Sequence, residues 1–130
     1  MSVEDNKQVV KKYMETMCTG DFDALMDVMT EDATWTVPGD LAVSGEHPKL
    51  EMKQILEAMA TKFASPVVWE ATGMIGEGDK VAAECLSSID TSDGKQYRNR
   101  YHILFQIRDG KIAKLVEYCD TKHVQDIFLS

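Results

Sequence analysis

The stretch Lys95–Ile107, KQYRNRYHILFQI, alternates between two kinds of side chain. Its odd-numbered positions are mainly apolar, whereas its even-numbered positions include two arginines and a histidine. Because successive side chains of a β-strand point to opposite faces of the sheet, this pattern predicts a strand with one face toward a core. The apolar row also contains Asn99 and Tyr101. We therefore expect polar groups on the inner face of this sheet.

Three further segments around this stretch have strand-like patterns. They are VVWEATGMI (67–75), KVAAECLSSID (80–90) and KIAKLVEYCD (111–120). Short sequences rich in glycine and aspartate separate the four segments, as is typical of hairpin turns. Together they predict a four-stranded antiparallel meander.

The first half of the chain has helical spacing instead. Apolar residues recur three and four positions apart in Val3–Thr19, after Asp21, and in Lys49–Phe63. Asp21 is a good N-cap, and we expect the second helix to end at residues 30–32. Three helices before a meander predict an α+β domain, with the helices on one face of a curved sheet and a pocket between them.

The connecting segments complete the predicted order. ATWTVPG (33–39) predicts a short strand that ends at Pro38-Gly39. Residues 40–48 have no clear period and predict a loop. The segment from Thr121 to Phe128 predicts a short closing helix.

Length and composition limit the classes of function. A chain of 130 residues is expected to be one domain, residues 1–130. Its net charge of −8 argues against nucleic-acid and anionic-membrane partners. No window resembles a membrane span or a signal peptide, so we expect a cytoplasmic protein.

The cysteines and histidines form no recognisable site in the sequence. Cys18, Cys85 and Cys119 lack the CxxC spacing, and the three histidines are scattered. These patterns predict buried thiols and neither a disulfide framework nor a metal site. We expect no cofactor.

The segment VVKKYMETMCTGDFDALMDVMTEDATW (9–35) resembles the opening of the NTF2-like superfamily. Ser44-Gly45 and the late segment RDGKIAKLVEYCDT (108–121) also fit, and the chain is most similar to SnoaL-like, ketosteroid isomerase-related proteins. The resemblance implies a cone-shaped fold with three N-terminal helices on a curved antiparallel sheet, enclosing a pocket. It also implies homodimers formed through the outer sheet face.

Two chemistries of this superfamily fit the sequence incompletely. Steroid isomerisation needs a carboxylate base, a phenol and a protonated acid. The phenol matches Tyr13, but Val37 occupies the position of the base and Ile103 that of the acid. The resemblance therefore does not extend to the classical steroid isomerase.

Limonene-type epoxide hydrolysis uses two carboxylates, an arginine, a tyrosine and an asparagine. The arginine and the first carboxylate fall at Cys85 and Ser87, and the tyrosine and asparagine at Trp35 and Val37. Only the second carboxylate, Glu117, is present. This motif is incomplete as well.

A SnoaL-like cyclase needs little more than one acid–base carboxylate in an apolar pocket. Glu117 is in phase with apolar residues of its strand, so we predict that it faces inward and is the catalytic group. Asp120 is the second catalytic candidate, with capping of the last helix as its alternative role. Tyr13 is the third, as a donor to an oxyanion.

The predicted ligand is a small hydrophobic or cyclic molecule. Asn99 and Tyr101 are expected to reach Glu117 across the sheet, and burial should raise the pKa of that carboxyl. The predicted substrate-binding residues are Trp35, Val37, Asn99, Tyr101, Phe105 and Leu115.

Two other functions stay open on the sequence alone. In a non-catalytic binding module, Asn99 and Tyr101 would simply satisfy Glu117 as a buried polar cluster. In a scaffold protein, the function would lie on the outer face of the sheet. Side chains would then fill the interior, with no cavity large enough for a ligand. For that outer face, which carries Arg98, Arg100, His102 and Glu84, we expect a dimer interface rather than a phosphate site. His47 is expected to be an exposed loop residue near the cavity mouth.

Overall fold

The computed structural model describes residues 1–129, and its first helices begin and end where local sequence signals place them. Helix α1 (Val3–Thr19) starts with a capping box, in which the Ser2 hydroxyl and the Asp5 carboxylate each accept from the other residue's backbone N–H. It ends at Gly20, whose φ of 74° suits glycine. Asp21 then caps α2 (Phe22–Asp27), as predicted.

The region after α2 differs from the prediction in two places. Residues 30–32 belong to strand β1 (Met29–Val37) and do not end a helix. The backbone N–H of Ile112 donates to the carbonyl of Val28 at 3.0 Å, so the chain joins the sheet as soon as α2 ends. Within the predicted loop, Gly45–Pro48 forms strand β2, which pairs antiparallel with β1. Four residues are too few to show a period in the sequence.

The second half forms the predicted meander. Strands β3 (Val68–Glu77), β4 (Lys80–Asp90), β5 (Gln96–Arg108) and β6 (Lys111–Cys119) pair antiparallel in chain order. Strand β1 lies parallel to β6, so residues 1–129 contain a sheet with the order β2-β1-β6-β5-β4-β3.

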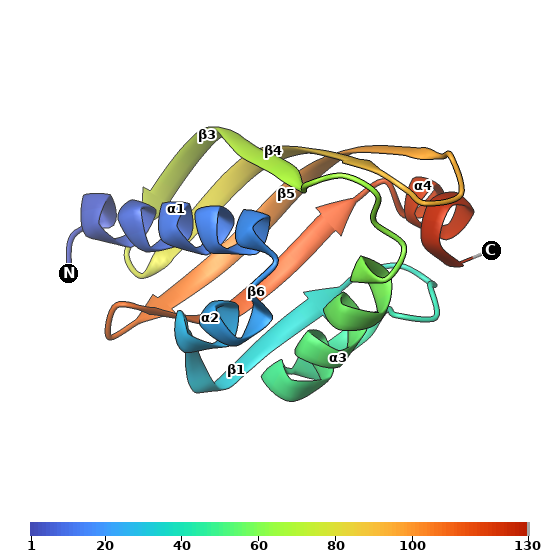
Figure 1. Ribbon diagram of the computed structural model, residues 1–130. Coiled ribbons are helices and arrows are strands. Elements are labelled where there is room, and N and C mark those ends of the chain that lie inside the picture. The colour runs from blue at the N-terminus through green and yellow to red at the C-terminus, as the bar shows by residue number, and fades with distance from the viewer. Residues whose placement is uncertain (130) are drawn as a thin grey trace.

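The helices lie on one side of the curved sheet. Figure 1 shows α1, α2 and α3 (Lys49–Ala60) over the same face. Helix α4 (Thr121–Val124) and the π-helical turn Gln125–Leu129 follow β6 at one end of the sheet. The observed α3 ends three residues before the predicted end at Phe63. The α+β class and the NTF2-like cone are confirmed.

The alternation of β5 has the predicted consequence. Ile103, Phe105 and Ile107 are buried beneath the helices, whereas Arg98 and Arg100 are exposed on the outer face. No helix within residues 1–129 combines the length and apolar character needed to cross a membrane. The three cysteines are free thiols; Cys85 is buried, while Cys18 and Cys119 are only half-buried.

Candidate functional site

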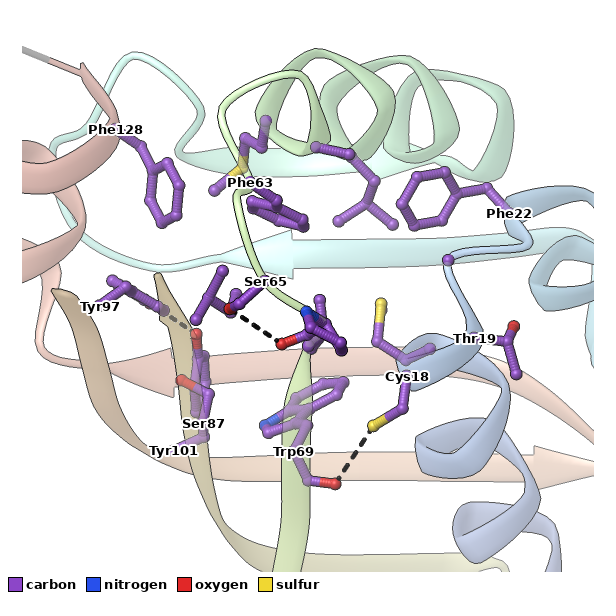
Figure 2. Close-up of a pocket in the computed structure, with 18 of the residues that line it drawn as sticks. Cys18, Thr19, Phe22, Phe63, Ser65, Trp69, Ser87, Tyr97, Tyr101 and Phe128 are labelled. Carbon is purple, nitrogen blue, oxygen red and sulfur yellow. Dashed lines mark hydrogen bonds between the residues drawn. The ribbon is translucent and has the colours of Figure 1, made fainter. Parts of the chain in front are cut away.

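A cavity of about 430 Å³ lies between the helices and the inner face of the sheet. Apolar side chains of α1, α2, α3 and the segment 63–69 form most of its wall, and Phe128 lies at one end. Strand residues give it a polar part, as Figure 2 shows for some of them. These strand residues are Trp35, Ser87, Tyr97, Tyr101 and Glu117.

Glu117 is the acidic residue of this wall. It is half-buried on β6, and burial raises the pKa of its carboxyl to about 7. The nearby Trp35 indole opposes this effect and lowers the pKa. Within residues 1–129, however, the Trp35 N–H makes no hydrogen bond of ordinary geometry, so its effect is the smaller one. A carboxyl with a pKa near neutrality can both take and give a proton at physiological pH.

The indole of Trp35 and the phenol of Tyr101 both line the cavity, and their predicted role in substrate binding stays a prediction. Tyr101 packs edge-to-face on Trp69, with ring centroids 5.5 Å apart. Both tryptophans of the chain line this cavity. Their fluorescence is therefore a direct probe of its contents.

Asn99 has a different position from the one predicted. Its amide is buried and bonds to the Tyr97 hydroxyl at 2.8 Å and to the backbone of Arg100 and Asp120. Asn99 is not among the described residues that line the cavity, and the hydrogen bonds of its amide go to Tyr97, Arg100 and Asp120 rather than to the Glu117 carboxyl. The strand register explains this, because β5 places Ile103 opposite Glu117 and Asn99 lies beyond the end of β6.

Three further predicted pocket residues are core residues. Val37, Phe105 and Leu115 are buried and do not contribute to the cavity wall that residues 1–129 form. Phe105 and Leu115 are register partners, and the phenol of Tyr13 packs edge-to-face on Phe105 at 5.4 Å. These side chains lie on the predicted inner face of the sheet, but they pack in the core: Leu115 is level with Trp35, and only the larger indole is part of the cavity wall.

Tyr13 lies behind the cavity wall. It is fully buried, and its hydroxyl has no hydrogen-bond partner among residues 1–129. Burial, followed by the charges of Glu117 and Cys85, raises the pKa of its phenol well above the ordinary value. The predicted role as an oxyanion donor does not fit this position, because the described cavity wall does not include Tyr13.

Asp120 caps a helix. Its carboxylate accepts from the backbone N–H of His123 at 3.2 Å at the start of α4, and its side chain is exposed. This is the alternative role considered for it. Asp120 is not among the described residues that line the cavity.

Comparisons with known proteins agree with this architecture. The SnoaL-like domain model matches residues 10–115. The chain belongs to the SnoaL-like family. No curated protein matches the sequence.

Solved structures resemble this SnoaL-like protein over nearly its whole length. An NTF2-like protein from Burkholderia xenovorans is 22% identical with a TM-score of 0.76, covering 98% of each chain. IdmH, a putative polyketide cyclase from Streptomyces antibioticus, is 16% identical with a TM-score of 0.79, covering 93% of this chain and 96% of its own. TerC, co-crystallised with polyporic acid, is 18% identical with a TM-score of 0.81, covering 97% of this chain and 99% of its own. At these identities the likeness establishes the NTF2-like fold.

His47 of this SnoaL-like protein is a buried strand residue, contrary to the prediction of an exposed loop histidine. It lies on β2 opposite Trp35. Its Nδ1 is 2.8 Å from a Glu51 oxygen, and its Nε2 is 2.7 Å from the Val43 carbonyl. It supports the indole that lines the cavity.

Several cavity residues were not predicted from the sequence. Trp69 and Ser87 come from β3 and β4, Cys18 from the end of α1, and Phe63 and Phe128 from segments far apart in the chain. Strand phase could have indicated Ser87, which alternates with the buried Cys85 and Ile89. For Phe63 and Phe128 the sequence holds no comparable signal. Residues 1–129 contain no cluster of three or more histidine, cysteine or acidic side chains suited to a metal ion.

Proposed function

We propose that this protein binds a small hydrophobic or cyclic carbonyl compound in the cavity and catalyses a proton transfer on it, as an isomerase or a polyketide cyclase-like enzyme does. Glu117 is the proposed acid–base group. The observation that carries the proposal is a carboxyl with a pKa of about 7 in the wall of a largely apolar cavity.

The reaction class follows from the position of the carboxyl. As a carboxylate, Glu117 accepts a proton from the carbon next to a substrate carbonyl, and the electron pair of that C–H bond moves to give the enolate. An isomerase returns the same proton to another carbon. In a cyclase, the enolate carbon bonds to a second carbonyl carbon of the substrate, and protonated Glu117 gives its proton to the alkoxide that forms.

The relatives support the proposal by analogy of fold. IdmH is described as a putative polyketide cyclase, and TerC was co-crystallised with polyporic acid. Both share this architecture at low identity, so they suggest a class of ligand and not a particular one.

Deuterium exchange tests the proposed chemistry. The protein is incubated with 1-tetralone, a bicyclic ketone, in D₂O, and mass spectrometry follows deuterium uptake next to the carbonyl. We expect catalysed exchange in the wild-type protein and a loss of at least about 100-fold in Glu117→Gln. Glu84→Gln on the exposed outer face is the matched control and should exchange like the wild-type protein. Asp120→Asn separates the two carboxyl candidates.

Binding is measured in parallel, by quenching of Trp35 and Trp69 fluorescence. Binding without any exchange in the wild-type protein would contradict the enzyme proposal and indicate the non-catalytic binding module. Exchange that Glu117→Gln retains would remove Glu117 from the mechanism.

We also propose that two copies of the chain pair through the outer face of the sheet. The register places Ile75, Ala82, Leu104 and Val116 in one row across β3, β4, β5 and β6. Ile75 is 73% exposed, and Tyr118, two residues beyond Val116 on the same face, is 51% exposed. Apolar side chains gathered on an exposed sheet face favour contact with a second protein surface. A second copy of the same sheet offers the same apolar row.

A further inference from the structure

The orientation of the Asn99 amide is fixed by the backbone. Its Oδ1 accepts from the backbone N–H of Arg100 at 2.8 Å and from that of Asp120 at 3.1 Å. Its Nδ2 is therefore the donor, to the Tyr97 hydroxyl at 2.8 Å and to the Asp120 carbonyl at 3.1 Å. Asn99 thus offers Tyr97 a hydrogen and cannot accept one from it.

The hydrogen bond between the hydroxyls of Tyr97 and Tyr101 uses only one of their two phenolic hydrogens. The hydroxyls of Tyr97 and Tyr101 are 2.5 Å apart, so one of their two hydrogens lies between them. The other hydrogen cannot go to Asn99, which already donates to Tyr97. One hydroxyl of the pair therefore keeps a hydrogen that none of these three residues uses.

Either hydroxyl can be the donor of this bond, and burial favours Tyr101 as the one that keeps the unused hydrogen. The Tyr97 side chain is 3% exposed, stacked on His123 at 5.2 Å and packed edge-to-face on Phe128 at 4.9 Å. Tyr101 is less buried. An unused donor costs less where a ligand or water can reach it, and the hydrogen bond from Asn99 polarises Tyr97 to donate onward.

Ser87 supplies a second unused polar group at the same end of the cavity. It is 7% exposed, and its hydroxyl makes no hydrogen bond of ordinary geometry within residues 1–129, although it lies close enough to the Tyr101 phenol to oppose the rise in the pKa of that group. Figure 2 shows Ser87 beside Tyr101, with the hydrogen-bonded Tyr97 next to them. Buried hydroxyls normally have partners, so this pair has unused capacity directed at the contents of the cavity.

We infer that Tyr101 and Ser87, with Tyr97 and Asn99 as positioning residues, form a subsite that binds a carbonyl or enolate oxygen of the ligand. The inference rests on the proposed function for the presence of a cyclic carbonyl compound in the cavity. It adds an orientation: the ligand's oxygen lies at the tyrosine end, and its carbon skeleton lies among the apolar side chains. Glu117 lines the same cavity and can then reach a neighbouring carbon.

Infrared spectroscopy of a bound ketone tests the subsite directly. The probe is 2-acetylnaphthalene labelled with ¹³C at its carbonyl, and 2-ethylnaphthalene is the matched ligand without oxygen. In the wild-type protein we expect the carbonyl band below its frequency in hexane, because a donated hydrogen bond weakens the C=O bond. Tyr101→Phe should return the band toward the hexane value and weaken ketone binding about tenfold, with hydrocarbon affinity unchanged. Tyr118→Phe is the control, because Tyr118 lies on the outer face of the sheet, opposite the cavity, and keeps the same change of side chain away from the ligand.

The positioning role of Tyr97 gives an intermediate result. Tyr97→Phe removes the polarising partner but leaves the Tyr101 hydrogen, so the band should move only part of the way. Should Tyr101→Phe fail to fold, Tyr97→Phe and Ser87→Ala carry the same test.

Two outcomes overturn the inference in distinguishable ways. If both naphthalenes bind and the carbonyl band is the same in every variant, the subsite is wrong and the cavity still binds ligands. If neither compound quenches the tryptophans of the wild-type protein, the subsite and the proposed function fail together.

Discussion

Trp35 and His47 are register partners across β1 and β2, with ring centroids 5.5 Å apart. Both nitrogens of His47 face acceptors, the Glu51 carboxylate and the Val43 carbonyl, and the protonated ring can donate to both. In that form it is a buried imidazolium next to the indole, which is a favourable cation–π arrangement. Protonation of His47 therefore stabilises the wall of the cavity from behind.

Glu51→Gln should lower the pKa of His47. Burial lowers that pKa, but the hydrogen bonds to Glu51 and Val43 and the charge of Glu51 outweigh burial, so it lies above its ordinary value of 6.5. Because the pKa of His47 is higher in the folded protein than in the unfolded chain, protonation of His47 stabilises the folded state. This stabilisation is fully present below pH 6.5 and is lost as the pH rises through the folded pKa. An NMR titration of the His47 ring, with the exposed His102 as the internal control, checks the change. An unaltered His47 pKa in Glu51→Gln would contradict this account.

Glu117→Gln should stabilise the folded protein at neutral pH. The folded state holds the Glu117 proton up to a pKa of about 7, against 4.5 for the free side chain. Folding therefore becomes less favourable as pH rises between these values, by at most about 3 kcal/mol, and levels off above them. Urea unfolding at a series of pH values should show this fall in the wild-type protein and lack it in Glu117→Gln. Glu84→Gln should retain it, and the same slope in all three proteins would refute the pKa assignment.

Ser87→Ala and Ser65→Ala should have different effects on stability. The buried Ser87 hydroxyl makes no hydrogen bond of ordinary geometry within residues 1–129 and lies near only the Tyr101 phenol, so its removal should be neutral or stabilise by up to about 1 kcal/mol. The Ser65 hydroxyl accepts from the backbone N–H of Asp90 at 2.8 Å, so Ser65→Ala should destabilise by about 1 kcal/mol. Thermal unfolding of the ligand-free variants measures both. Equal losses would mean that Ser87 has a structural partner.

Leu104→Glu should separate the proposed dimer. Leu104 lies in the exposed row of the outer sheet face, and a carboxylate there would be desolvated in the interface. Leu50→Glu is the matched control, because Leu50 is 65% exposed on α3 and away from this face. Sedimentation at micromolar concentration should give a dimer for the wild-type protein and Leu50→Glu, and a monomer for Leu104→Glu. A monomeric wild-type protein would end the proposal.

Strand phase explains which parts of the fold and site could be predicted. The alternation around Ile103 and Phe105 fixed the inner face of β5, and the same reasoning placed Glu117 in the cavity. Phase gives the face of a sheet but not which inward side chains the core covers, so Phe105 and Leu115, which are level with the cavity residue Trp35, were assigned to the wall in error. The short strand β2 carried too few residues for any periodic signal.

Phe128 closes one end of the cavity and so helps to set its length, whereas the proposed proton-transfer group, Glu117, lies on a strand of the sheet. Phe128 packs on Phe63 and Tyr97, and it belongs to the turn after α4, outside the sheet that holds Glu117. Substitutions in this last segment can lengthen or shorten the cavity while the strands keep their register. Exchanging Gln125–Leu129 between relatives is thus a practical way to alter ligand size, with the proton-transfer group left in place.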